Sequence, residues 1–424
     1  MLISHRRWIL STLLLIICTT SAVAADFERS SAARAGMSSA RLERLDTVLK
    51  SYVDKDQLAG QVVLVLRHGR IAFSAENGLR NIKAGLPMTE DTIFRIASQT
   101  KAIVSAGIMI LHERGQLDIG HVLSRYIPEW TDMQVAVANE QGGYDLVPAK
   151  RPITLRNLLT HTGGMSYGNG PAAAAWEAAG FQGWYFANKD EAIGISIARM
   201  GSLPLDAHPG ESWIYGYNTD ILGAVIEKAS GVDLSTFLQA EIFEPLGMEN
   251  THFYLPEAKA DQLAVVYQPK SGGGIEAIPA TDGMRSQGLY LNGPRKSYSG
   301  GAGLLSTAYD YARFLQMTLN GGELNGERIL SRKTIELMTT SHLGDIRFRD
   351  GQGFGLGFSV VNDLGARGSV GSEGEYGWGG AYHSTYWVDP TEDLVVVYLT
   401  QIIPATGLDD YLKLRSGIYQ AIVD

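Results

Sequence analysis

Cysteine is nearly absent from this sequence, and basic residues never cluster. Cys18 is the single cysteine among 424 residues, so the chain has neither a disulfide framework nor a cysteine-ligated metal site, and thiol catalysis is excluded. Lys and Arg number 36 against 45 Asp and Glu, a net charge of −9, and without a basic run the sequence predicts no nucleic-acid partner. The nine histidines lack metal-ligand spacing and no Gly-Lys-Ser/Thr phosphate loop occurs, so we expect neither a metal nor a cofactor.

A short apolar stretch near the N terminus has the features of a targeting signal. Residues 8–18 are apolar, follow the charged residues 5–7 and precede the small residues 22–24. This pattern predicts a secretory signal peptide over residues 1–24, cleaved after Ala24, and export to the periplasm or the medium. The alternative is an uncleaved membrane anchor, for which the stretch is short. After cleavage we expect no stable membrane insertion.

Hydrophobic periodicity predicts strands near both ends of the chain. The composition, 45% hydrophobic and 19% charged, is that of a globular protein. The patterns predict helices at 39–53, 102–114, 219–230 and 408–422, and strands at 61–67, 70–76, 354–361, 384–388 and 394–400. Asn218 or Thr219 is the expected N-cap of the third of these helices. The pattern indicates an α+β fold with one sheet assembled from distant segments: an α/β lobe from 25–96 and 297–424, and a mostly helical lobe from 97–296.

Ser166 lies in a sequence that matches a known nucleophile motif. Gly164-Met165-Ser166-Tyr167-Gly168 has the G-x-S-x-G spacing, which requires a strand before the serine and a helix after it. The preceding residues 154–160 have a helical pattern instead, and the serine falls in a glycine-rich loop. We therefore interpret Ser166 as a loop serine, with nucleophile as the alternative.

Ser98 and Lys101 form a stronger candidate pair. Ser98 is the only serine followed three residues later by Lys, and positions i and i+3 at the start of a helix share a face. A serine hydroxyl needs a base to become a nucleophile. Lys101 can serve if burial and nearby positive potential lower its pKa, and the surrounding apolar residues agree with burial. The alternative is an exposed helical lysine that follows a serine by chance.

Several motifs, in order along the chain, resemble those of the serine β-lactamase and penicillin-binding-protein superfamily. The similarity is greatest to the class C β-lactamase branch and its esterase relatives, the family VIII carboxylesterases, and it covers roughly residues 38–422. The motifs are Arg95-Ile96-Ala97-Ser98-Gln99-Thr100-Lys101, Leu158-Leu159-Thr160-His161-Thr162, Pro209-Gly210 with Tyr215, Glu244-Pro245-Leu246-Gly247-Met248, and Ser299-Gly300-Gly301-Ala302-Gly303-Leu304. The resemblance implies the serine β-lactamase-like fold, an antiparallel sheet flanked by helices plus a helical lobe.

The resemblance also implies catalytic roles. Ser98 matches the acylated nucleophile, Lys101 the lysine of its proton network, and Tyr215 the tyrosine that acts with Lys101 as general base. Tyr217 is the alternative tyrosine, but the spacing along the sequence to Gly223 favours Tyr215, as in the esterases. A core tyrosine is the structural alternative for Tyr215, and His161 is interpreted as structural.

The third motif departs from the β-lactamase pattern. A β-lactamase has Lys-Thr-Gly on an edge strand, whereas this chain has Trp378-Gly379-Gly380-Ala381. Trp378 replaces the lysine that holds a β-lactam carboxylate, so that cation is missing from the motif, as in the esterases. The Ala381 and Ser98 N–H groups are the expected oxyanion hole. A bulge over 377–380, with Trp378 in the core, is the alternative.

A few further residues are candidates for the substrate site. A class C β-lactamase typically has Tyr-x-Asn, whereas here two residues separate Tyr215 from Asn218. His383 lies two residues after Ala381, the expected oxyanion-hole residue. We list Trp378, Gly379, Gly380, Asn218 and His383 as substrate-binding, with a satisfied strand histidine as the alternative for His383. Three aromatic residues, Trp176, Trp184 and Tyr185, would shape an apolar pocket, although packing explains each one singly.

These observations predict an exported serine hydrolase that cleaves carboxylic esters, small or hydrophobic ones above all, through an acyl-enzyme on Ser98. A class C-like β-lactamase, a D-amino-acid-specific peptidase or an acyltransferase with the same Ser-Lys-Tyr set is the alternative. A non-catalytic binding protein on this scaffold is a further one, although it would have no need of all three residues.

Overall fold

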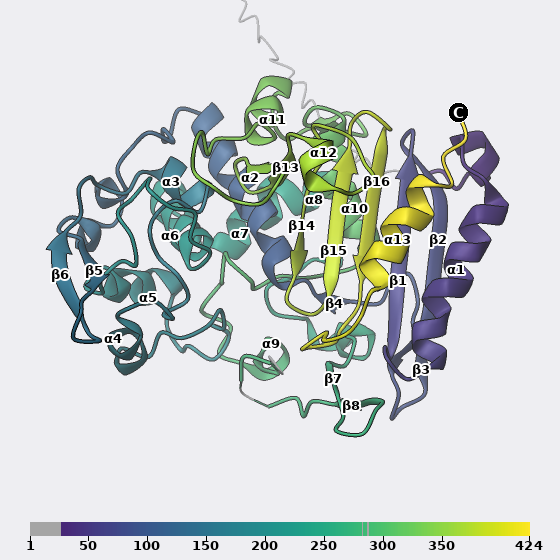
Figure 1. The fold of residues 1–424 in the computed structure, drawn as a ribbon, viewed down its shortest axis with the longest axis horizontal. Helices are drawn as coiled ribbons and strands as arrows, with labels where there is room; N and C mark the ends of the chain where they lie inside the picture. Colours follow the sequence, from purple (N-terminus) through teal and green to yellow (C-terminus); the bar gives the residue numbers. More distant parts are fainter. Residues whose placement is uncertain (1–26, 282, 286–287) are drawn as a thin grey trace, which may run out of the picture.

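The computed structural model describes residues 27–281, 283–285 and 288–424, and the predicted signal peptide lies outside them. Within these ranges the largest sheet has eight strands: β1 (Gly60–Arg67), β2 (Arg70–Asn81), β3 (Leu86–Pro87), β12 (Gln352–Phe354), β13 (Ser359–Val361), β14 (Tyr376–Gly380), β15 (Ser384–Asp389) and β16 (Leu394–Leu399). Their order is β12-β13-β14-β15-β16-β1-β2-β3, and neighbouring strands run antiparallel (Figure 1). The predicted α+β architecture, with one sheet from distant segments, is confirmed.

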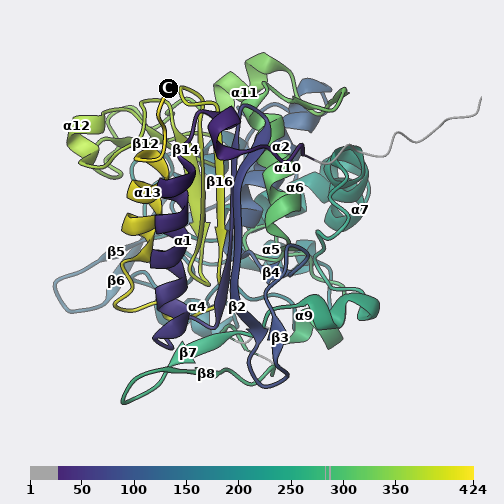
Figure 2. The same ribbon diagram turned by 90° about the vertical axis from the view of Figure 1, so that its right-hand side faces the viewer.

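Strand β1 lies inside the sheet and is buried along its whole length. Because side chains alternate between the faces of a strand, Val63 and Val65 pack against α1 (Ser39–Asp54) and α13 (Asp410–Tyr419). The alternate residues belong to the main core, which also contains α2 (Thr100–Glu113) and α10 (Ala308–Leu319). Figure 2 shows α1 and α13 side by side on one face of the sheet, with α2 and α10 behind it. The sheet is thus covered on both faces.

Helix α2 is the central helix of the molecule. Residues 100–111 are all buried, and an all-round buried helix must have neighbours on every side. It packs on α6 (Asn218–Ser230) and α7 (Leu234–Leu238), which belong to the helix-rich segment between the two sheet-forming parts of the chain. The N terminus of α2 therefore lies where the sheet and this helix-rich segment meet.

The remaining elements are short. The helices are α3 (Leu155–Leu159), α4 (Ala173–Ala178), α5 (Ile193–Met200), α8 (Glu244–Leu246), α9 (Leu289–Asn292), α11 (Arg332–Met338) and α12 (Leu364–Arg367); the 3-10 and π turns are η1 (Ala32–Ala35), η2 (Ala97–Gln99), η3 (Leu123–Arg125), η4 (Pro128–Trp130), η5 (Gln239–Phe243) and η6 (Glu257–Gln262). Small paired strands are β4 (Phe94–Arg95) with β9 (Leu305–Ser306), β5 (Gln134–Ala138) with β6 (Tyr144–Pro148), β7 (Tyr267–Pro269) with β8 (Ile275–Ala277), and β10 (Glu323–Leu324) with β11 (Glu327–Arg328). No helix among the described residues has both the length and the apolar character to cross a bilayer. The lobe boundaries stay a prediction.

Two local expectations are wrong. The strand predicted at 354–361 is a hairpin of β12 and β13, in which Phe354 pairs with Ser359. The chain turns at Gly357, where φ is +95° and a Cβ would stand 2.5 Å from the Ser105 hydroxyl, so only glycine suits the position. The N-cap of α6 is Tyr217, without a side-chain capping bond. Asn218 lies inside the helix instead.

Candidate active site

Ser98 lies in η2, a single 3-10 turn between β4 and α2. Ala97 before it has φ +44°, which is uncommon for a residue with a Cβ. The turn is held from outside, because Ile96 N–H donates to the Leu304 carbonyl (3.1 Å) and Leu304 N–H donates to the Thr100 hydroxyl (3.0 Å). Ser98 lines a cavity of ≈ 630 Å³. A strained turn braced by neighbouring backbone thus presents this serine to an open cavity.

The Lys101 ammonium lies below Ser98, 2% exposed. Its Nζ donates to Ser98 Oγ (3.3 Å), to the Tyr167 hydroxyl (2.9 Å) and to the Gly301 carbonyl (2.6 Å). Three acceptors match the three protons of an ammonium group. The predicted Ser98–Lys101 contact is therefore present, and the exposed-lysine alternative is wrong.

A buried carboxylate fixes the loop that contacts Lys101. Asp220 of α6 accepts from the Ser299 hydroxyl (2.6 Å) and from Gly301 N–H (2.9 Å). Burial raises the pKa of Asp220, and the Lys101 charge acts in the opposite direction. Asp220 thus positions the Gly301 carbonyl for Lys101. Sequence reasoning missed this residue because its partners are about eighty positions away.

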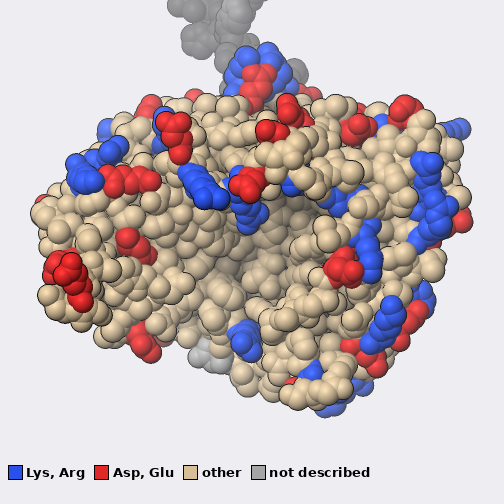
Figure 3. Space-filling model, viewed as in Figure 1, with Lys and Arg blue, Asp and Glu red and all other residues tan. Residues whose placement is uncertain are grey.

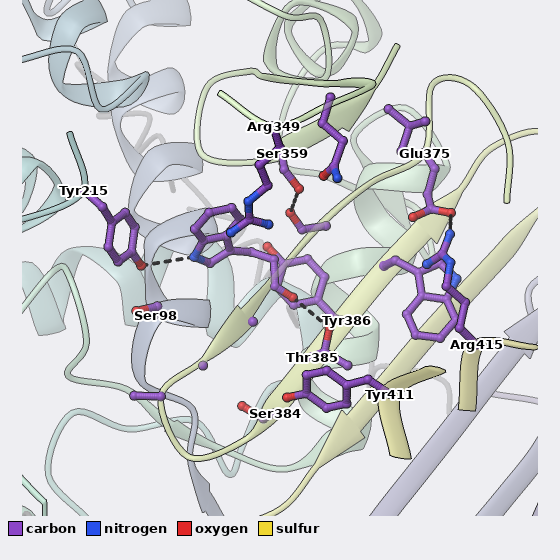
Figure 4. Close-up of a pocket in the computed structure, with 18 of the residues that line it drawn as sticks. Ser98, Tyr215, Arg349, Ser359, Glu375, Ser384, Thr385, Tyr386, Tyr411 and Arg415 are labelled. Atoms are coloured by element: carbon purple, nitrogen blue, oxygen red, sulfur yellow. Dashed lines mark hydrogen bonds and ion pairs between the residues drawn. The ribbon is translucent and has the colours of Figure 1, made fainter. Parts of the chain in front are cut away.

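Tyr215 lies on the wall of the same cavity, whereas Tyr217 does not. Lys101 Nζ is 4.7 Å from the centre of the Tyr215 ring, and Trp378 Nε1–H donates to the Tyr215 oxygen (3.1 Å; Figure 4). Tyr217 is buried and stacks on Trp176, with ring centres 5.6 Å apart. Tyr215 therefore has the Lys101 cation against its ring and an N–H donor on its oxygen.

Tyr167 is the second tyrosine at the site and was missed by the sequence analysis. It lines the cavity and accepts from Lys101, but it is a neighbour of Ser166 in the sequence and carries no motif of its own. Burial, reinforced by Tyr215, raises the pKa of Tyr167 well above its usual value of 10. This shift favours the neutral phenol at Tyr167.

Strand β14 closes the cavity beside Ser98. It pairs with β15 in unbroken register from Tyr376 to Gly380, so the predicted alternative of a bulge is wrong. A Cβ on Gly380 would stand 2.5 Å from the Ile96 carbonyl, which shows how closely β14 approaches the serine turn. Trp378, Gly379, Gly380 and Ala381 all line the cavity with Ser98. The placement suits an oxyanion hole from the Ser98 and Ala381 N–H groups, and that role stays a prediction.

Two predicted substrate-binding residues lie elsewhere. Asn218 is buried and its amide donates to His161 Nδ1 (3.1 Å) and to the Ile214 carbonyl (3.2 Å). His383 Nε2 is bonded to Asp410 (2.7 Å), and its ring stacks on Tyr411. Neither residue lines the cavity. Both side chains are occupied by internal hydrogen bonds, which for His383 agrees with a satisfied histidine on a strand.

The remaining candidates, one serine and three aromatic residues, lie in different surroundings. Ser166 is 8% exposed and lies in a loop, where its hydroxyl accepts from Asn169 N–H (3.2 Å). Of the three predicted pocket aromatics, Trp184 lines the cavity, Trp176 is core, and Tyr185 packs against Tyr290. Figure 3 shows the hollow in this face, with largely uncharged walls and basic side chains along its upper edge beside a few acidic ones.

His161 packs against Tyr215 but stays neutral. Its ring centre is 4.8 Å from that of Tyr215, and the residue is 1% exposed. Burial, with a smaller contribution from the Lys101 charge, holds the pKa of His161 well below its ordinary value of 6.5. A neutral imidazole also suits Nδ1 as the acceptor from Asn218. This supports the structural interpretation of His161.

The neutral His161 predicts a pH dependence of stability. Below pH 6.5 the unfolded chain binds a proton at this residue and the folded chain does not, so the free energy of unfolding falls as the pH falls. Between pH 7 and pH 5 the wild type should lose about 2 kcal/mol more than His161→Gln. Urea unfolding of both proteins at the two pH values measures this difference, and equal losses would contradict the assignment. Other titrating groups are common to both proteins and cancel.

Known proteins resemble this chain over most of its length. The sequence profile of the Beta-lactamase family matches residues 45–415. Esterase EstB of Burkholderia gladioli is 32% identical over 84% of this chain and 89% of its own, and a lovastatin esterase of Penicillium rubens is 28% identical over 86% and 94%. The solved structure of EstCE1, a hydrolase with promiscuous acyltransferase activity, superimposes with a TM-score of 0.76 at 27% identity, covering 89% of this chain and 98% of that one.

Proposed function

Because this chain belongs to the Beta-lactamase family and is a serine hydrolase of its esterase-containing branch, we propose that it hydrolyses carboxylic esters through an acyl-enzyme on Ser98. The observation that carries the proposal is the Lys101 ammonium, which contacts Ser98 Oγ in a cavity also lined by Tyr215. The esterases among its relatives support an ester as substrate.

In the first half-reaction, Lys101 and Tyr215 have different roles. Lys101 Nζ contacts Ser98 Oγ directly, so it supplies a hydrogen bond and positive charge beside the nucleophile. The Tyr215 oxygen takes the proton of Ser98 as Oγ attacks the ester carbon. The carbonyl oxygen becomes an oxyanion, held by the Ser98 and Ala381 N–H groups. Tyr215 then gives the proton to the alkoxide as the C–O bond breaks, and the alcohol leaves.

The second half-reaction uses the same groups in reverse. Water enters the place of the alcohol, Tyr215 takes one of its protons, and the resulting hydroxide attacks the acyl carbon. The acid is released as the proton returns to Ser98 Oγ. An alcohol in place of this water would give acyl transfer, as the description of EstCE1 illustrates for that protein.

Parallel assays test the proposal. Purified protein from Ala25 onward is expected to turn over p-nitrophenyl acetate and butyrate rapidly and a chromogenic cephalosporin slowly. Dominant cephalosporin turnover would contradict an esterase and favour the β-lactamase alternative. Adding 1-butanol to the ester assay separates hydrolysis from transfer, because a transferase forms butyl ester at the expense of free acid.

We also propose that the protein is exported, on the basis of the signal-like residues 1–24. Expression of the full chain in a Gram-negative host is expected to yield a periplasmic form whose N terminus is Ala25. An intact N terminus in the membrane fraction would indicate the anchor instead.

A further inference from the structure

The cavity beside Ser98 is rich in positive charge, although the protein as a whole is acidic. Its charged lining consists of Arg349, Arg367, Arg415 and Glu375, whereas the whole chain has a net charge of −9. Because charges of one sign in a cleft concentrate ligands of the opposite sign, this imbalance indicates an anionic group on the substrate.

Two of these arginines already have a carboxylate partner. Arg367 lies 3.1 Å from Glu375, and Arg415 forms an ion pair with the same carboxylate. Figure 4 shows Arg415 and Glu375 on one side of the cavity and Arg349 nearer to Tyr215, where the Trp378 ring contacts both Arg349 and Tyr215. Glu375 thus offsets one of the two positive charges of Arg367 and Arg415.

Arg349 is different. Its guanidinium carbon is 5.0 Å from the Trp378 ring centre and 4.9 Å from that of Phe348, so it lies on an aromatic surface. Among the residues that the structure describes, it forms no ion pair with Asp or Glu, since the adjacent Asp350 pairs with Arg347. Partial burial lowers the pKa of Arg349, and Tyr215 acts in the opposite direction. Trp378 stands where the third motif of a β-lactamase has a lysine. Arg349, from another part of the chain, brings a positive charge to the same cavity.

We propose that Arg349 binds a carboxylate on the alcohol part of the substrate, so that the preferred substrates are esters of hydroxy acids. The proposal rests on the esterase function above. In that mechanism Tyr215 protonates the leaving oxygen, so a group beside Tyr215 faces the leaving part of the ester. A guanidinium supported by two rings can form the paired hydrogen bonds that a carboxylate accepts.

A matched pair of substrates tests the proposal. We would measure kcat/KM for 3-acetoxybenzoate and for its neutral methyl ester with the wild type, Arg349→Met and Arg349→Lys. The charged-to-neutral ratio should fall about tenfold or more in Arg349→Met and recover in part in Arg349→Lys. The control is Arg347→Met, whose exposed guanidinium pairs with Asp350 outside the cavity, and it should keep the wild-type ratio.

The outcomes distinguish this proposal from the esterase function. A ratio that is unchanged in Arg349→Met, or lowered equally in Arg347→Met, overturns the role of Arg349 and leaves the esterase function standing. If the wild type turns over neither these esters nor p-nitrophenyl acetate, the esterase function fails. Calorimetric titration with 3-hydroxybenzoate then decides for Arg349: a Kd about tenfold weaker in Arg349→Met supports carboxylate binding, and an equal Kd overturns it.

Discussion

Ser98→Ala is expected to lower kcat for p-nitrophenyl acetate at least about a thousandfold, because loss of a nucleophile removes the acyl-enzyme route and leaves only binding and oxyanion stabilisation. The side chain accepts a single hydrogen bond from Lys101 and faces the cavity, so its removal opens no void in the core. The thermal unfolding midpoint should therefore stay close to that of the wild type. Intact-mass measurement should detect an acylated wild type and no acylated variant.

Ser166→Ala is the matched control for this experiment. Ser166 stands in the other serine motif of the sequence, and its hydroxyl only accepts from a loop N–H. The variant should keep ester turnover close to the wild-type rate. If Ser98→Ala stays active while Ser166→Ala loses turnover, the nucleophile is Ser166 and the mechanism above is wrong.

Tyr215→Phe is expected to lower kcat about a hundredfold to ten-thousandfold, the range for loss of a general acid–base group. Phenylalanine preserves the ring that Lys101 and Trp213 contact and removes only the oxygen. The effect should appear in kcat more than in KM, because that oxygen acts on the transferring proton. Rates with esters of less acidic alcohols should fall most, because their leaving oxygens need the proton most.

Tyr217→Phe provides the control two positions along the chain. Tyr217 keeps its stack on Trp176 without the hydroxyl and does not line the cavity, so ester turnover should stay near wild type. The two variants decide between the tyrosines that the sequence offers. A larger loss in Tyr217→Phe than in Tyr215→Phe would reverse the assignment.

Local spacing explains why part of the site was predictable. Ser98 and Lys101 are three residues apart, and one turn of chain brings them together whatever surrounds it. The Trp378 indole that donates to Tyr215 comes from 163 positions along the chain. Its place in the motif was visible in the sequence, but its bond to Tyr215 was not, because only the packing of β14 creates it. Arg349 belongs to none of the motifs, and only the tertiary fold brings its guanidinium to the cavity.

The fold, too, was only partly predictable from the sequence. Runs rich in β-branched and aromatic residues predicted β1, β15 and β16 nearly to their ends, because each strand is long enough to show such a run. The residues around Gly357 are also apolar, so periodicity suggested one strand where a tight turn exists. Asn218 resembles a helix cap by residue type alone, yet burial beside His161 uses its amide elsewhere.

The pairing of β1 with β16 has a consequence for how the chain reaches its native state. The Tyr398 hydroxyl bonds to Gln61 across 337 positions of sequence, and β1 has β16 as a neighbour along most of its length. Closing such a large loop is slow, and the β1–β2 hairpin must wait for it during synthesis with one edge unpaired. Until β16 is made, β1 has one strand edge without a partner, and an unpaired edge on a largely apolar strand is a template for aggregation. Strand β16 thus protects β1 from pairing with other chains.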